Sequence, residues 1–174
     1  MFTLVVGGAA SGKSGYAEEL LLSSPCPPRF YLATMEPLDE GCRARIARHR
    51  RMRAGKGFET VERFTNLAGL RLAARGSVLL ECLGNLAANE LYSPAGAGDR
   101  ALEALVAGVE ALLAQSDTLI VVSNEVFTGG SSYKGNTGAY LSLLACANRA
   151  LARRADRVCE IVCGLPVYYK GGPA

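Results

Sequence analysis

Residues 7–14 read Gly7-Gly8-Ala9-Ala10-Ser11-Gly12-Lys13-Ser14, between an apolar run at Thr3 to Val6 and a helical pattern over Lys13 to Leu22. The spacing matches the phosphate-binding loop G-x-x-x-x-G-K-[ST] in its strand–loop–helix context. Glycines let backbone N–H groups turn toward a phosphate, Lys13 supplies a mobile cation, and the Ser14 hydroxyl can ligate Mg²⁺. The stretch therefore predicts a nucleoside triphosphate site; the alternative is an ordinary glycine-rich turn.

On both sides of this loop, short apolar runs alternate with amphipathic stretches. Such alternation is typical of βαβ units around a mostly parallel sheet that carries helices on both faces. The sequence therefore predicts an α/β fold with a doubly wound, mostly parallel sheet. The expected strands are Thr3 to Val6, Phe30 to Thr34, Phe58 to Val61, Val78 to Cys82, Leu119 to Ser123 and Val158 to Val162.

Helices are expected where apolar residues recur every three to four positions. The clearest pattern runs from Asp99, a favourable N-cap residue, to Ala114. Glycine and serine gather at Ser93 to Gly98 and at Thr128 to Gly138, where we expect mobile loops that can carry ligand contacts. The other expected helices are Lys13 to Leu22, Leu38 to Arg53, Asn66 to Ala74 and Ala139 to Arg154.

Length and composition favour one domain. A chain of 174 residues lies within the usual range of about 100 to 200 residues per domain, so we expect residues 1–174 to form a single nucleotide-binding domain. Hydrophobic residues make up 49% of the chain, which excludes an extended disordered protein. Apolar runs reach only strand length, so no membrane span is expected. The first residues do not resemble a secretory leader, which predicts a cytoplasmic location.

The six cysteines are scattered and form no C-x-x-C pair. Their spacing argues against a cysteine metal site or a disulfide framework and predicts small, buried, apolar thiols. They are Cys26, Cys42, Cys82, Cys146, Cys159 and Cys163.

Basic charge is concentrated in one segment. The net charge is only +3, yet six arginines lie within Arg43 to Arg53. This segment predicts a local binding surface for an anion. A nucleic-acid patch would need only basic residues along one face, but no aromatic residue interleaves with these arginines and the remaining chain is not basic. We therefore expect no nucleic-acid partner.

Acidic and polar residues follow two of the expected strands. Glu81 ends the run Val78 to Cys82, which resembles the strand-end acid that holds Mg²⁺ or its water shell in phosphate-loop proteins. A solvated strand-end acid is the alternative. Asn124 and Glu125 follow the strand Leu119 to Ser123, where they could contact substrate or cap a turn.

His49 is the only histidine in the chain. On a helix it would lie one turn from Arg45 and one turn from Arg53, whose charges disfavour the imidazolium and should lower the pKa of His49. A neutral imidazole among arginines could attack the α-phosphorus of a nucleotide. The residues alone favour the other interpretation, a surface histidine on a solvated basic helix.

Taken in order, these features resemble the bifunctional adenosylcobinamide kinase / adenosylcobinamide-phosphate guanylyltransferase family of cobalamin biosynthesis. The resemblance spans nearly the whole chain, and the combination of R-I-x-x-H-R with N-E-V makes it more specific than the phosphate loop alone. Its pieces are residues 7–14, YLAT at 31–34, RIARHR at 45–50, LLECLGNLAANEL at 79–91, SNEV at 123–126, NRALA at 148–152 and GLP at 164–166.

The resemblance implies two reactions, phosphorylation of adenosylcobinamide and transfer of GMP from GTP to adenosylcobinamide phosphate. It implies that His49 carries GMP covalently, that Lys13 assists, and that GTP or ATP is used with Mg²⁺ at Ser14 and Glu81. A RecA-like fold, a corrinoid partner and a homotrimer are implied too. The implied nucleotide-binding positions are Gly7, Gly8, Ala9, Ala10, Ser11, Gly12, Lys13, Ser14, Ala33, Thr34, Met35, Arg50, Arg51, Met52, Arg53, Glu62 and Glu81.

The chain departs from the family pattern in two places. Ala10 stands where the family usually has arginine, and the region after Val126 lacks the usual proline, arginines and aspartate. Tyr133, Lys134 and Tyr140 lie in that region and are candidates for substrate contact. Two other interpretations stay open: a small-molecule kinase with a phosphate loop but without guanylyl transfer, and a nucleotide-binding module that has lost turnover.

Overall fold

The computed structural model describes residues 1–127 and 134–172. Seven strands form one sheet in the order β3-β2-β4-β5-β1-β6-β7. All neighbouring strands pair in parallel except β6 and β7, which form an antiparallel hairpin. The strands are β1 (Phe2–Gly7), β2 (Arg29–Ala33), β3 (Phe58–Glu62), β4 (Gly76–Glu81), β5 (Ser116–Asn124), β6 (Arg157–Val162) and β7 (Leu165–Lys170).

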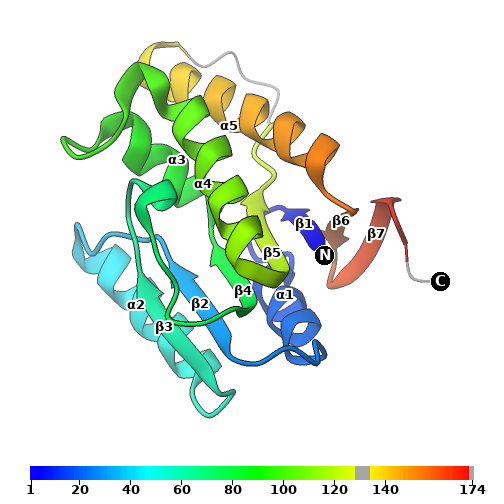
Figure 1. The fold of residues 1–174 in the computed structure, drawn as a ribbon. Helices are drawn as coiled ribbons and strands as arrows, with labels where there is room; N and C mark the ends of the chain where they lie inside the picture. The colour runs from blue at the N-terminus through cyan, green and yellow to red at the C-terminus, as the bar shows by residue number, and fades with distance from the viewer. Residues whose placement is uncertain (128–133, 173–174) are drawn as a thin grey trace.

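Helices cover both faces of the sheet, so the predicted α/β, doubly wound architecture is confirmed (Figure 1). Helices α3, α4 and α5 lie over one face, and α1 and α2 over the other. Two short 3₁₀ turns, η1 (Leu67–Gly69) and η2 (Gly98–Arg100), complete the elements. The helices are α1 (Lys13–Leu22), α2 (Glu40–Arg53), α3 (Leu83–Tyr92), α4 (Ala101–Gln115) and α5 (Gly135–Arg154).

Each face of the sheet carries its own apolar core. The side under α3, α4 and α5 buries the larger cluster, which includes Leu80, Leu86, Leu105 and Leu144. The side under α1 buries a smaller cluster around Val5 and Leu21. Side chains alternate between the two faces along a strand, so central strands buried on both sides consist almost entirely of apolar residues.

Helix α2 packs differently from the other helices. Arg53 is its one buried residue, whereas α1, α3, α4 and α5 each bury two or more apolar side chains. The Asp39 side chain caps the helix by accepting a hydrogen bond from the Cys42 N–H at 2.6 Å. The helix is therefore held against the protein by a few polar contacts, described below, rather than by an apolar stripe.

Two sequence predictions are wrong. The segment Asn66 to Ala74 forms only η1, because Asn66 adopts a left-handed conformation and Leu67 inserts against α4. Asp99 lies in η2, and α4 begins after Arg100 without a side-chain cap.

The strand predictions and that of α1 are confirmed, with small shifts of their ends, but the sequence patterns missed α3 and β7. Part of the expected mobile loop, residues 128–133, lies outside the described residues, and Gly135 to Gly138 belong to α5 rather than to a loop. Of the cysteines predicted to be buried, Cys82 and Cys159 are buried, while Cys163 is exposed. Among the described residues, no helix is both long enough and apolar enough to cross a bilayer.

Close packing at Gly108 gives a stability test of the fold. A Cβ atom at this position of α4 would lie 2.7 Å from the Leu67 Cβ of η1. Helix propensity favours Gly108→Ala by about 1 kcal/mol, but forcing Leu67 aside costs about 1 to 3 kcal/mol. We expect Gly108→Ala to lower the free energy of unfolding in urea. Gly15→Ala in α1, where a Cβ meets open space, should be neutral or stabilising. An unchanged or raised stability of Gly108→Ala would contradict the packing.

Candidate active site

The phosphate loop lies between the end of β1 and the first turn of α1. Gly12 adopts a left-handed conformation at φ 93°, which favours glycine, immediately before Lys13 opens the helix. A Cβ on Gly7 would lie 2.5 Å from the Ser11 Oγ. The Lys13 ammonium donates to the Gly8 carbonyl at 3.0 Å and so folds back over the loop. The loop therefore has the close backbone approach and the positioned cation that a phosphate group requires.

Glu81 meets this loop from the neighbouring part of the sheet. The Ser14 hydroxyl donates to Glu81 Oε1 at 3.0 Å, and Glu81 Oε2 is enclosed and has no hydrogen-bond partner within residues 1–127 and 134–172. Burial raises the pKa of Glu81 to about 7, opposed by the Ser14 hydrogen bond and by the Lys13 charge, while the Glu18 charge adds to the rise. Paired hydroxyl and carboxylate oxygens are the hard donors that Mg²⁺ prefers, so the residues fit a bound Mg²⁺.

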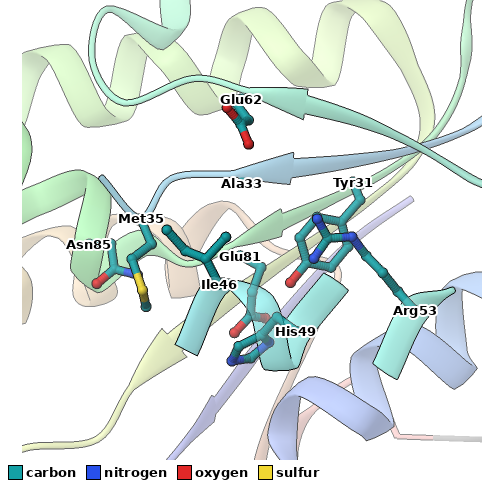
Figure 2. A pocket seen from close by; sticks show the side chains of 9 residues that line it. All are labelled: Tyr31, Ala33, Met35, Ile46, His49, Arg53, Glu62, Glu81 and Asn85. Carbon is teal, nitrogen blue, oxygen red and sulfur yellow. The ribbon is translucent and has the colours of Figure 1, made fainter. Parts of the chain in front are cut away.

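His49 faces the sheet from α2. Ile46, His49 and Arg53 are three and four residues apart and line one cavity together with Glu81 (Figure 2). The imidazole is half-buried, and its Nδ1 atom is enclosed and finds no hydrogen-bond partner in the part of the chain that the structure describes. The ring therefore reaches the interior rather than extending into solvent from a basic helix.

The pKa of His49 is lowered, as the sequence predicts, but the main cause differs. Burial has the largest effect, followed by the positive charge of Arg48; Arg53 and Lys13 lower the pKa further, and Glu18 raises it. From helical spacing alone, the shift was expected to come from Arg45 and Arg53. A largely neutral imidazole at neutral pH follows from either cause.

Two cavities meet at this ring. The first is narrow, about 40 Å³, and extends from His49 toward Tyr31, Ala33 and Glu62. The second, about 450 Å³, extends over the phosphate loop from Ala9 to Gly15. Both are lined by the same four residues, Met35, His49, Glu81 and Asn85. His49 thus lies at the junction between a phosphate-binding surface and a cavity that leads along β2.

Comparison with known proteins agrees with this geometry. The model of the cobinamide kinase / cobinamide phosphate guanyltransferase family matches residues 3–169. The chain belongs to this family. The bifunctional adenosylcobalamin biosynthesis protein CobU of Escherichia coli strain K12 is 33% identical over 184 residues, which cover 98% of this chain and 100% of the relative. The corresponding CobP of Pseudomonas aeruginosa strain PAO1 is 33% identical over 178 residues, 99% of each chain.

Membership in the cobinamide kinase / cobinamide phosphate guanyltransferase family makes the protein a nucleotide-using transferase of cobalamin biosynthesis. A solved structure adds a likeness in fold alone. The flagellar accessory protein FlaH from Methanocaldococcus jannaschii superimposes with a TM-score of 0.51 at 10% identity, covering 99% of this chain and 80% of that chain. Together with the strand order, this likeness confirms the predicted phosphate-loop, RecA-like class of fold.

Most residues carried over from the family pattern meet around the cavities. Ala33, Met35, Arg53 and Glu62 line the first cavity, and Ala9 to Ser14 with Met52 line the second. Arg50 forms an ion pair with Glu62 at a neighbouring surface depression.

Besides Arg50, four of the predicted positions line neither cavity: Gly7, Gly8, Thr34 and Arg51. The Thr34 hydroxyl is buried and bonds both backbone polar groups of Cys82, at 2.8 and 2.7 Å, so its side chain joins β2 to the start of α3. Arg51 is exposed and lines neither cavity.

Two residues that line the second cavity were not predicted from the sequence. Arg48 directly precedes His49, whereas the helical spacing singled out the arginines four residues away. Asn85 belongs to α3, which the sequence patterns did not reveal. Asn124, one of the polar residues expected at the strand ends, lines the second cavity, whereas Glu125 accepts a hydrogen bond from the Phe127 N–H at 2.8 Å. Tyr133 lies outside the described residues.

The buried Glu81 predicts a measurable pH dependence of stability. Its folded-state pKa of about 7 exceeds the ordinary 4.5, so the folded protein retains a proton that the unfolded chain releases between these values. The unfolding free energy should therefore fall as pH rises from about 4.5 to 7, by on the order of 3 kcal/mol. Glu81→Gln removes this dependence, so we expect its stability relative to wild type to improve between pH 5 and pH 8 in urea denaturation. Glu19→Gln, at an exposed position, is the control. A pH-independent difference between Glu81→Gln and wild type would contradict the assignment.

Proposed function

We propose that the protein phosphorylates adenosylcobinamide and then transfers GMP from GTP to adenosylcobinamide phosphate, with His49 as the covalent carrier of GMP. One observation supports the guanylyl-transfer step above all others. The only histidine of the chain is half-buried between the phosphate-loop cavity and the cavity along β2, with a lowered pKa. A neutral imidazole beside a bound triphosphate is a suitable nucleophile toward phosphorus.

The proposed transfer has two displacements. In the first, the lone pair of His49 Nε2 forms a bond to the α-phosphorus of GTP, the bond from that phosphorus to the bridging oxygen breaks, and its electron pair leaves with pyrophosphate. In the second, a phosphate oxygen of adenosylcobinamide phosphate forms a bond to the same phosphorus and the N–P bond breaks. The electron pair returns to Nε2, so the imidazole is regenerated. Nε2 is the attacking atom because Nδ1 is enclosed.

Positive charge around the ring suits this chemistry. Arg45, Arg48 and Lys13 line the second cavity beside His49. Guanidinium and ammonium groups stabilise the negative charge that develops on phosphate oxygens during transfer. Ser14 and Glu81 would hold Mg²⁺, which neutralises phosphate charge when it is bound. A volume of about 450 Å³ lies within the range of small-molecule sites.

The nucleoside is assigned to the residues carried over from the family pattern. We propose contacts from Ala33 to Met35, from Arg50 to Arg53, and from Glu62. Gly7 to Ser14 hold the phosphates, with Lys13 also assisting transfer. The first displacement requires GTP as the donor of GMP. The kinase step uses GTP or ATP at the same loop.

A homotrimer is part of the proposal. The β7 strand leaves large apolar side chains exposed at the edge of the sheet, with Leu165 70% and Tyr169 69% exposed. Exposed apolar groups of this size are often covered in an assembly.

Sedimentation velocity tests the proposed homotrimer. It should give three times the chain mass, and a monomer mass at micromolar concentration would refute the trimer.

Transfer of label tests the covalent step. We expect GTP labelled at the α-phosphate to mark the wild-type protein through an acid-labile bond, and we expect His49→Ala to lose the label because the nucleophile is absent. Arg43→Ala changes an exposed arginine on the same helix that lines neither cavity, and it should keep the label. Gel autoradiography before and after acid treatment measures both.

The alternatives give different outcomes in the same assay. Transfer of a γ-label to adenosylcobinamide without α-label on the protein would indicate a kinase alone. Tight GTP binding with neither reaction would indicate a binding module. Label retained by His49→Ala would refute His49 as the carrier.

A further inference from the structure

Besides Glu81 Oε2, which is assigned to Mg²⁺ above, and the Ser11 hydroxyl of the loop itself, two enclosed polar atoms beside the phosphate loop have no hydrogen-bond partner among the described residues. They are His49 Nδ1 on α2 and Glu18 Oε1 on α1. Leaving a buried donor or acceptor unpaired costs about 1 to 3 kcal/mol, so such atoms ordinarily find partners. An imidazole nitrogen can donate and a carboxylate oxygen can only accept, so the two atoms are chemically complementary.

Glu18 is held firmly in place. It lies one helical turn after Ser14, and its side chain is only 1% exposed. Its Oε2 accepts a hydrogen bond from the Lys56 ammonium at 2.5 Å. Lys56 follows the end of α2, seven residues after His49, so this ion pair brings the His49-bearing face of α2 toward Glu18. One carboxylate oxygen is thus used to join α1 to the end of α2, and the other is free.

The charges around His49 support the same arrangement. Arg48, Arg53 and Lys13 disfavour its positive form, whereas Glu18 favours it, with a larger effect than that of Arg53. Glu81 and Tyr31 face the same cavity from β4 and β2.

We propose that Glu18 is a positioning residue for His49: its Oε1 accepts a hydrogen bond from a bridging water that in turn accepts one from Nδ1–H. Holding the proton on Nδ1 leaves the Nε2 lone pair exposed to the cavities. The consequence for catalysis rests on the proposed function. When Nε2 bonds to phosphorus the ring becomes cationic, the Nδ1 proton stays on the ring, and the Glu18 carboxylate balances the new charge.

Because the chain contains one histidine, the tautomer can be read directly. Protein labelled with ¹⁵N-histidine gives the two ring nitrogens of His49 alone. We expect wild type above the pKa of His49 to show a protonated Nδ1 and an unprotonated Nε2. A proton on Nε2 instead would overturn the proposal, and this measurement needs neither turnover nor a variant.

Glu18→Gln should reverse the tautomer. The Lys56 ammonium can only donate, so it takes the amide oxygen, and the amide N–H₂ group then donates to the bridging water, which turns a hydrogen toward Nδ1. The proton moves to Nε2, the atom that must attack. Glu19→Gln, the exposed neighbour on α1, should leave the wild-type spectrum unchanged. A Glu18→Gln spectrum identical to that of wild type would contradict the proposal, and if this variant does not fold, the wild-type spectrum decides.

Single-turnover labelling with α-labelled GTP tests whether Glu18 affects the rate at which His49 takes up GMP. We expect Glu18→Gln to slow labelling of His49 about 10²-fold, the size of a general acid–base contribution, with the Kd for GTP nearly unchanged. A purely structural role would instead weaken binding and labelling together or affect neither, and either result would overturn positioning. If wild type takes no label, the proposed function fails, and the tautomer still decides the role of Glu18.

Discussion

Parallel pairing of the central strands is the constraint on which the site depends. In the observed register Gly7 of β1 lies beside Asn124 of β5, and Ala33 of β2 lies beside Glu81 of β4. Parallel strands end at the same edge of a sheet, so the loops that follow them meet there. The phosphate loop and the strand-end acid come together for this reason, although 67 residues separate Ser14 from Glu81.

Helix α2 completes the site through polar contacts. It has little apolar surface to bury, and the guanidinium of Arg53 instead lies 4.2 Å from the centre of the Tyr31 ring, while its Nε atom donates to the Thr60 hydroxyl at 3.2 Å. The Lys56–Glu18 and Arg50–Glu62 ion pairs add further links to the body of the protein. Charged groups retained near an interior often specify one arrangement rather than maximise stability, and here that arrangement places His49 against the phosphate loop.

Strands and helices whose sequence pattern has a strong local cause were predicted well. Strands β1 to β6 were found because short runs of β-branched and aliphatic residues are typical of a buried sheet, and α1 because a phosphate loop leads into a helix. Helix α3 was missed because Cys82, at its N-cap position, provides no side-chain cap and the helix follows β4 directly. The segment after Asn66 looked helical but packs as a short turn, because a tertiary contact at Leu67 outweighs its weak helical preference.

For the site as well, some features follow from local sequence and others from the tertiary structure alone. Residues 7–14 predicted a phosphate site by themselves, because that chemistry is local to a few neighbouring residues, whereas the residues around His49 favoured a surface histidine and left its role open. Tertiary structure alone decided that burial controls the pKa of His49 and that Asn85 reaches the phosphate-loop cavity. It alone decided, too, that Lys56 and the buried Glu18 pair across 38 residues of sequence. Burial and long-range pairing depend on how the helices pack on the sheet. The local sequence pattern of a single segment does not encode that packing.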